Sequence, residues 1–133
     1  MNFERPVFPA QGANIPLLLV LSATHFLNDM MQSLIPAMYP IIKQAYALDY
    51  GQIGLITLTF QVTASLLQPA VGYVTDRHPM PYSTVVGMLF TLCGLIGLAF
   101  ASSYALLLVS AASVGLGSSI FHPEATRMAR NAS

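Results

Sequence analysis

Four apolar segments, each long enough to cross a membrane, limit what this chain can fold into. They cover about residues 15–42, 53–74, 83–101 and 104–123 and are separated by short polar stretches. An α-helix needs roughly 20 apolar residues to span the hydrocarbon core of a bilayer. The pattern therefore predicts an all-α integral membrane protein with four transmembrane helices, surrounded by the lipid bilayer.

The composition agrees with a membrane protein and argues against other classes. Hydrophobic residues make up 55% of the 133 residues and charged residues only 8%, whereas soluble domains carry roughly 25% charged residues. The net formal charge is zero. The sequence also has no basic or acidic run, which argues against nucleic acid as a partner. The single cysteine cannot form an internal disulfide.

Both ends of the chain are expected on the same side of the membrane, because the number of spans is even. Residues 1–14 are predicted to be a cytoplasmic tail. They make a poor signal peptide because the apolar segment behind them is too long, so cleavage after Ala23 is disfavoured. The side of the termini carries four arginines and the other side only Lys43, which predicts cytoplasmic termini by the positive-inside rule. These arginines are Arg5, Arg77, Arg127 and Arg130.

The first segment carries polar residues at helical spacing. His25, Asn28, Asp29 and Gln32 stand at i, i+3, i+4 and i+7, which places them on one face. An ionisable side chain at membrane depth costs at least ~2.5–3.5 kcal/mol, so it indicates function by default. A carboxyl group in a low dielectric favours its protonated form, and histidine titrates near physiological pH.

We therefore predict a proton-responsive site at Asp29 and His25. Asn28 and Gln32 would offer neutral hydrogen bonds to a polar substrate. The alternative is a polar face that only packs against neighbouring helices.

A second polar stripe follows the second segment. Thr57, Gln61, Ser65, Gln68 and Gly72 are separated by four, four, three and four residues, which places them on one side of a helix. Glutamines that face lipid are costly, so the stripe should face protein or a water-filled cavity. The sequence leaves open whether Gln61 and Gln68 contact a substrate or only hold helices together.

The fourth segment ends in a charged cluster. Glu124 and Arg127 are spaced i, i+3 and can pair, and Arg127 with His122 would attract a negatively charged substrate. Glu124 would hold Arg127 or relay a proton. The alternative is an ordinary amphipathic helix end, because the cluster lies near the edge of the hydrocarbon layer. Pro123 is expected to kink or end this helix.

Prolines and small residues predict two further features. Pro36 and Pro40 each remove a backbone donor, which predicts a bend near the far end of the first helix. One face of the third segment carries small residues, which let two helices approach closely in lipid. These residues are Thr84, Gly87, Thr91 and Gly94.

Several runs of sequence resemble the major facilitator superfamily. Residues 72–77, Gly-Tyr-Val-Thr-Asp-Arg, resemble the family's loop signature, in which Asp and Arg follow a glycine by four and five residues. The match is partial, since Pro79 replaces the later glycine and Met80 and Pro81 replace basic residues. Further runs closely resemble the fosmidomycin resistance proteins, bacterial inner-membrane drug exporters of that superfamily. These runs are residues 25–29, 56–61, 66–69, 76–81 and 117–124.

The resemblance implies properties that the residues alone do not. It implies twelve spans in two six-helix halves, a midplane cavity with alternating access, and export of a drug or metabolite by proton antiport. It assigns Gly72, Asp76 and Arg77 to a cytoplasmic gate. Such halves contain inverted three-helix repeats, so residues 15–133 are expected to be a partial transporter domain. We expect a fragment that is inactive without the missing helices, with no cofactor and no metal site.

Three alternatives remain open. A small four-helix multidrug exporter acting as a homo-oligomer would match the length, although such proteins resemble one another in a first-helix glutamate where this chain has Asp29. An intramembrane hydrolase would use His25 with Asp29, or His122 with Glu124, but no HExxH or GxSxG motif supports it. A regulatory or inert fragment would pair with a separately encoded remainder.

Overall fold

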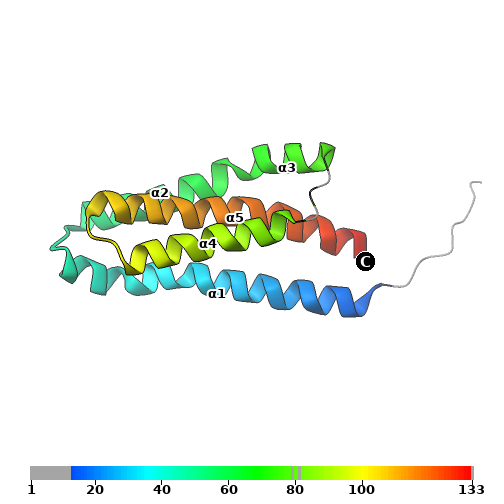
Figure 1. The fold of residues 1–133 in the computed structure, drawn as a ribbon, viewed down its shortest axis with the longest axis horizontal. Helices are drawn as coiled ribbons and strands as arrows, with labels where there is room; N and C mark the ends of the chain where they lie inside the picture. The colour runs from blue at the N-terminus through cyan, green and yellow to red at the C-terminus, as the bar shows by residue number, and fades with distance from the viewer. Residues whose placement is uncertain (1–12, 79, 81, 133) are drawn as a thin grey trace, which may run out of the picture.

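The structure, a computed structural model, describes residues 13–78, 80 and 82–132, and almost all of this part is helical (Figure 1). The helices are α1 (Ile15–Ala45), α2 (Tyr50–Leu66), α3 (Gln68–Arg77), α4 (Ser83–Ala99) and α5 (Tyr104–Ala132). Helices α2 and α3 together take the place of the second predicted span. The tail predicted for residues 1–14 lies mostly outside the described residues, as do Pro79 and Pro81 of the loop signature.

Successive spans run antiparallel, so both ends of the described chain lie at the same end of the bundle (Figure 1). There the Asn14 backbone N–H donates to the Ala132 carbonyl over 2.8 Å. The end of α3 lies at this end as well, whereas the connections between α1 and α2 and between α4 and α5 lie at the other (Figure 1).

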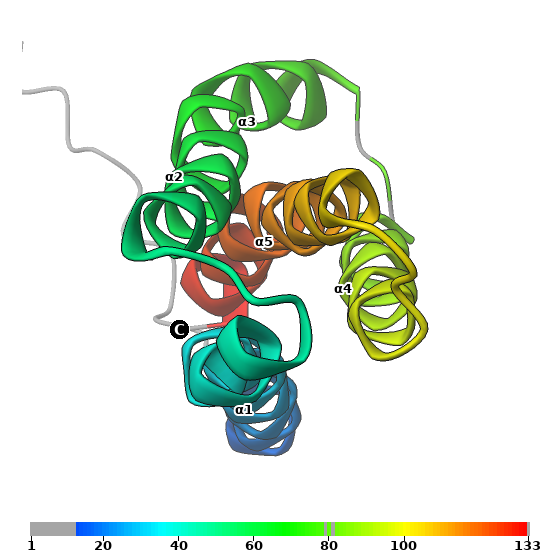
Figure 2. The ribbon, with the colours of Figure 1, turned by 90° about the vertical axis from the view of Figure 1, so that its left-hand side faces the viewer.

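Helix α5 is the centre of the bundle. It contacts each of the other four helices, and in the end-on view it lies among α1, α2 and α4 (Figure 2). Many of its buried residues are small, which lets the neighbouring backbones come close. They include Ser110, Ala111, Gly115, Gly117, Ser118 and Ser119.

Glycines set the distance between α4 and α5. A Cβ atom on Gly94 would lie 2.7 Å from the Ser110 carbonyl oxygen, and a Cβ atom on Gly117 would lie 2.5 Å from the Gly87 carbonyl oxygen. Real Cβ atoms do not approach that closely, so only hydrogen fits at either position. The small face predicted on the third segment is thus the face that packs on α5, with Gly87, Thr91 and Gly94 buried.

Helix α2 begins earlier than the sequence analysis predicted, because Asp49 caps it. The Asp49 carboxylate accepts from the Gln52 backbone N–H over 2.7 Å, and the Gln52 side chain accepts from the Asp49 backbone N–H over 3.0 Å. This reciprocal capping box satisfies backbone donors that a helix start leaves unpaired. The helix therefore begins at Tyr50 rather than near Ile53.

The second span is broken at Leu67, where the sequence analysis predicted one continuous helix. Pro69 has no backbone N–H with which to continue the α-helix, and it occupies the first turn of α3 instead. Between Ala64 and Thr75 no residue is buried. Packing therefore does not hold the two parts in line at this point.

The prolines of α1 and α5 do not end their helices. Pro123 lies inside α5, between the buried Phe121 and Glu124, and the helix end predicted near residue 123 is not found. Pro36 and Pro40 likewise lie inside an unbroken α1. Buried residues within two positions of each proline, Ile35 and Ile42 on α1 and Phe121 and Glu124 on α5, keep the helices in place. One backbone hydrogen bond is nevertheless lost at each proline.

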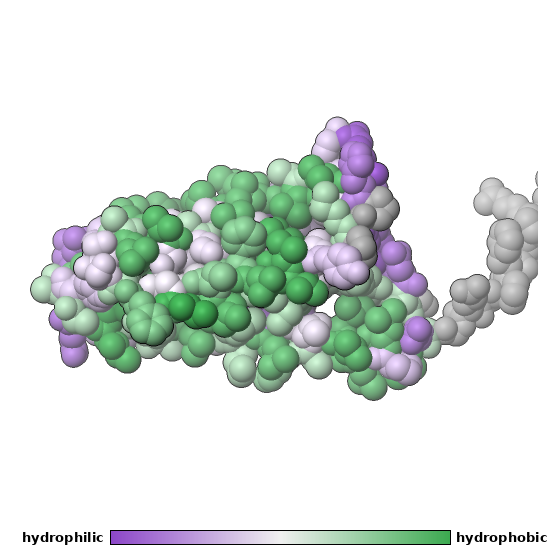
Figure 3. Space-filling model, in the orientation of Figure 1, coloured by the Kyte–Doolittle hydropathy of each residue, from purple (hydrophilic) through white to green (hydrophobic). Residues whose placement is uncertain are grey.

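The surface between the two ends of the bundle is apolar. On the face seen in Figure 3, hydrophobic side chains cover the length of the molecule, and hydrophilic ones gather at its ends. Exposed large side chains include Phe26, Leu58 and Val109, and so large an apolar surface suits lipid rather than water. Among the described residues, Tyr50–Arg77 and Tyr104–Ala132 are long and apolar enough to span a membrane, while α4 is apolar but has 17 residues.

The packing of α5 on α4 predicts the effect of a single methyl group. Gly117→Ala should lower the free energy of unfolding by about 1–3 kcal/mol, because the new Cβ atom meets backbone atoms that cannot move aside easily. The thermal unfolding midpoint of the 133-residue chain in detergent, followed by circular dichroism, measures the change. Gly54→Ala is the matched control, since a Cβ atom there meets nothing within 4 Å. Equal midpoints for the two variants would contradict the predicted clash.

Candidate functional site

Two ionisable residues lie one turn apart on α1. His25 Nε2 is 3.3 Å from Asp29 Oδ2, and the two side chains are 43% and 52% exposed. The buried residues of α1 include Leu21, Asn28 and Ile35, at intervals of seven residues. His25 and Asp29 therefore lie beside the buried face of α1 and open to the outside of the described bundle.

Helix α5 adds a second histidine to this pair. His122 Nε2 lies 3.9 Å from Asp29 Oδ1, and the ring centroids of His25 and His122 are 5.0 Å apart. The buried Phe121 ring lies against both imidazoles, at centroid distances of 5.7 and 5.8 Å. Each carboxylate oxygen of Asp29 thus faces an imidazole from a different helix, which the sequence analysis did not foresee.

The other two polar residues of the predicted face of α1 retain unused hydrogen-bonding capacity. Asn28 is fully buried, and neither its amide nitrogen nor its amide oxygen has a partner among the described residues. The amide nitrogen of Gln32 is also buried and unpaired in this part of the chain. Unpaired buried amides are costly, so a polar molecule that reached them would gain hydrogen bonds.

The charged cluster near the end of α5 is an ion pair that also holds α3. Arg127 Nη2 lies 2.6 Å from Glu124 Oε2, which confirms the pairing predicted from their spacing. Arg127 Nη1 also donates to the Thr75 carbonyl on α3 over 2.6 Å. Glu124 is 1% exposed, and its second carboxylate oxygen has no partner within the described ranges. One guanidinium therefore joins two helices and neutralises a buried carboxylate.

A cleft of about 300 Å³ between α3 and α5 brings together five residues that the sequence analysis selected. Gln68, Gly72 and Asp76 come from α3, and His122 and Arg127 come from α5. The cleft also contains residues that the sequence analysis did not assign to a site, because only knowledge of which helices are neighbours reveals them. They are Thr75, Pro123, Thr126 and Arg130.

Two predicted site residues lie elsewhere. Gln61 is exposed on α2 and does not line the cleft. Arg77, which the sequence analysis placed in a loop together with Asp76, belongs to the last turn of α3. Its guanidinium lies over the Tyr73 ring, 3.6 Å from the centroid.

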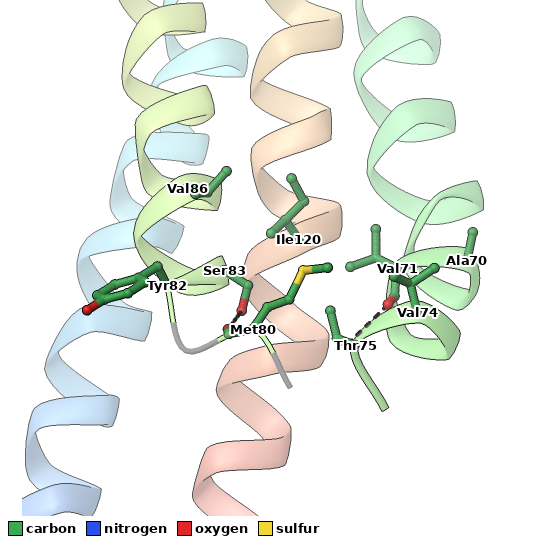
Figure 4. Close-up of a pocket in the computed structure, with 9 residues that line it drawn as sticks. All are labelled: Ala70, Val71, Val74, Thr75, Met80, Tyr82, Ser83, Val86 and Ile120. Atoms are coloured by element: carbon green, nitrogen blue, oxygen red, sulfur yellow. Dashed lines mark hydrogen bonds between the residues drawn. The ribbon is translucent and has the colours of Figure 1, made fainter. Parts of the chain in front are cut away.

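A larger groove, of about 640 Å³, lies between α3, α4 and α5 (Figure 4). Two of its hydroxyl groups are already used, since the Thr75 hydroxyl donates to the Val71 carbonyl and the Ser83 hydroxyl donates to the Met80 carbonyl. No sequence motif pointed to this groove. Its lining is mostly apolar and carries no charged side chain. The lining consists of Ala70, Val71, Val74, Thr75, Met80, Tyr82, Ser83, Val86 and Ile120.

The site thus has two chemically different parts. The cluster of His25, Asp29 and His122 can exchange protons or hold a cation, because it combines a carboxylate with two imidazoles. The cleft beside Arg127 can attract an anion, although this guanidinium already contacts Glu124. His122 belongs to both parts.

Comparison with known proteins confirms the resemblance seen in the sequence. Residues 21–133 match the model of the family described as Major Facilitator Superfamily. The chain is 58% identical over 113 residues to the Fosmidomycin resistance protein of Escherichia coli (strain K12) and 43% identical over 114 residues to the uncharacterized MFS-type transporter YfnC of Bacillus subtilis (strain 168). The matches cover 85% and 86% of this chain, and the chain spans 28% of the length of each relative. No solved structure matches the chain significantly.

The ion pair on α5 predicts an asymmetric response to mutation. Arg127→Met should destabilise the chain by about 3–5 kcal/mol, because it leaves the Glu124 carboxylate buried without its partner. The double substitution Arg127→Met with Glu124→Met should restore much of that loss, since no charge then remains buried. Thermal unfolding in detergent measures both. A double variant less stable than Arg127→Met alone would contradict this account of the pair.

Proposed function

The chain belongs to the major facilitator superfamily, and we propose that it forms part of a membrane transporter that exports a small polar molecule. Members of this family are transporters and not enzymes. The observation that carries the proposal is the cluster of His25, Asp29 and His122. It sets ionisable groups on a largely apolar bundle and leaves them partly exposed, which is costly in a membrane unless they line a pathway.

The proposed cargo is a small polar or anionic drug or metabolite. One relative bears the name Fosmidomycin resistance protein, so fosmidomycin is the first compound to test. Arg127 and His122 in the cleft would attract a negative group on such a molecule. The amides of Asn28, Gln32 and Gln68 would offer hydrogen bonds, and Gln61 would face the same pathway from α2.

The proposed driving force is proton antiport. His25, Asp29 and Glu124 are the groups that would exchange the proton. In support, two of them lie in direct contact on α1, and Glu124 is buried beside the substrate cleft with one oxygen still unpaired among the described residues. Entry of a proton would then drive export of the cargo in the opposite direction.

The proposed gate lies where α3 meets α5. Arg127 ties the backbone of α3 at Thr75 to α5, and Gly72 and Asp76 line the cleft beside it. Arg77 lies at the end of α3, over Tyr73. Opening the pathway on this side would require this contact to be released.

The proposed setting is the bacterial inner membrane, with both ends of the chain in the cytoplasm. The end of the bundle that carries Arg77, Arg127 and Arg130 would then face inward, in agreement with the positive-inside rule. Two six-helix halves with alternating access would complete the transporter, and this chain would supply a partial domain of the first half. The remaining helices, if separately encoded, would be its partner.

A chimeric protein tests the transport proposal with this chain's own residues. Replacing the matching 113-residue segment of the Escherichia coli relative by the segment of this chain should preserve fosmidomycin resistance in a sensitive strain. Asp29→Asn in the chimera should lower the minimum inhibitory concentration to that of cells without the transporter, because the carboxylate of the cluster is lost.

The matched control is Asp49→Asn in the same chimera. It removes a carboxylate from the N-cap of α2, where asparagine caps equally well, so resistance should not change. Full resistance with Asp29→Asn at normal expression would remove Asp29 from the mechanism. Resistance conferred by the 133-residue chain alone would instead support the small homo-oligomeric exporter.

Orientation can be tested with single cysteines. In a Cys93→Ser background, His78→Cys should react with a membrane-impermeant maleimide only after the inner membrane is opened. A cysteine that replaces Ala47, in the loop at the other end of the bundle, should react in intact spheroplasts. The reverse pattern would place both ends of the chain outside the cytoplasm.

A further inference from the structure

We propose that His25, Asp29 and His122 form a binding site for a divalent transition-metal ion of the Zn²⁺ type. The inference goes beyond the transport function proposed above and does not depend on it. No metal site is expected from the sequence, because the two histidines belong to the first and fourth segments and share no metal-ligand spacing. The fold brings them to the same carboxylate.

The distances suit one shared ion. One donor atom from each of the three residues can be chosen so that all lie within 4.8 Å of one another. Ligand atoms on a tetrahedral zinc ion, with bonds of ~2.0–2.2 Å, lie about 3.3–3.6 Å apart. The 3.3 Å between His25 Nε2 and Asp29 Oδ2 already meets this value. His122 Nε2 lies 3.9 Å from the other carboxylate oxygen, Asp29 Oδ1, and no two of the chosen donor atoms are more than 4.8 Å apart. An ion would therefore have to draw the donor atoms together by at most about 1.5 Å.

The donor set selects the class of metal. Two imidazole nitrogens and one carboxylate oxygen bind zinc in sites that keep a fourth position for water, and similar sets bind Fe²⁺. Mg²⁺ and Ca²⁺ prefer oxygen ligands alone. The cluster contains no thiolate, which disfavours Cu⁺.

The arrangement is held by the fold and is open on one side. The i, i+4 spacing on α1 fixes His25 and Asp29 relative to each other, and the buried Phe121 ring lies against both imidazoles. The three side chains are 43%, 52% and 27% exposed in the order His25, Asp29 and His122. An ion therefore has a path of entry and space for a water ligand, and it would link α1 to α5.

Titration of the full 133-residue chain in detergent with Co²⁺, followed by visible absorption, tests the site, and competition then gives the affinity for Zn²⁺. We expect one ion per chain. His25→Gln and His122→Gln should each weaken binding at least about tenfold, since loss of even an outer partner of a metal ligand costs that much. Asp29→Asn should weaken it as well.

His78→Gln is the matched control. It removes the remaining histidine of the chain, which follows the end of α3 and does not belong to the cluster. The affinity should therefore not change. Absence of one-to-one binding, or equal affinities for the chain, His25→Gln and His122→Gln, would overturn the proposal.

A second measurement covers variants that fold poorly. Because an ion that binds only the folded chain stabilises it, Zn²⁺ should raise the thermal unfolding midpoint of the chain and of His78→Gln but not of His122→Gln. Circular dichroism without metal reports whether each variant is helical. None of these measurements involves transport, so metal binding and drug export can fail independently.

Discussion

The close approach of α5 to its neighbours is the constraint on which the rest of the structure depends. In lipid no hydrophobic force drives helices together, so association relies on packing and hydrogen bonds. Gly94 and Gly117 leave no room for a Cβ atom between α4 and α5, and Gly115 makes a similar contact with α2 near Phe60 and Thr63. Any larger residue at these positions would push away the helix that carries the site.

The central position of α5 explains why the site has several parts. Residues on one helix point in different directions, and here each direction meets a different neighbour. His122 faces the ionisable pair of α1, whereas Arg127 reaches the backbone of α3 at Thr75. The region around Pro123 therefore connects the cluster of His25, Asp29 and His122 to the cleft beside Arg127. A displacement of α5 relative to either neighbour would alter both parts at once.

Periodicity and length allowed the sequence to predict the helices, the small face of α4 and the pairing of Glu124 with Arg127, because these depend on residues close together in the chain. Contacts between residues far apart in the sequence could not be predicted in this way. The meeting of Asp29 with His122 depends on which helices are neighbours, and the contact of Arg127 with Thr75 uses a carbonyl that every residue possesses. The break at Leu67 was missed because proline alone does not decide it: Pro123 sits in a helix that packing preserves, and Pro69 does not.

Because of the break at Leu67, the two parts of the second span are held in place by different contacts. Before the break in sequence, α2 packs against α5. After the break, α3 is anchored mainly near its C-terminal end, through the buried Thr75 and the guanidinium of Arg127. Helix α3 is thus joined to α2 at the break and held against α5 near its other end. Release of the Arg127 guanidinium would leave the buried Thr75 as the remaining anchor of the ten residues of α3, while α2 would stay packed against α5.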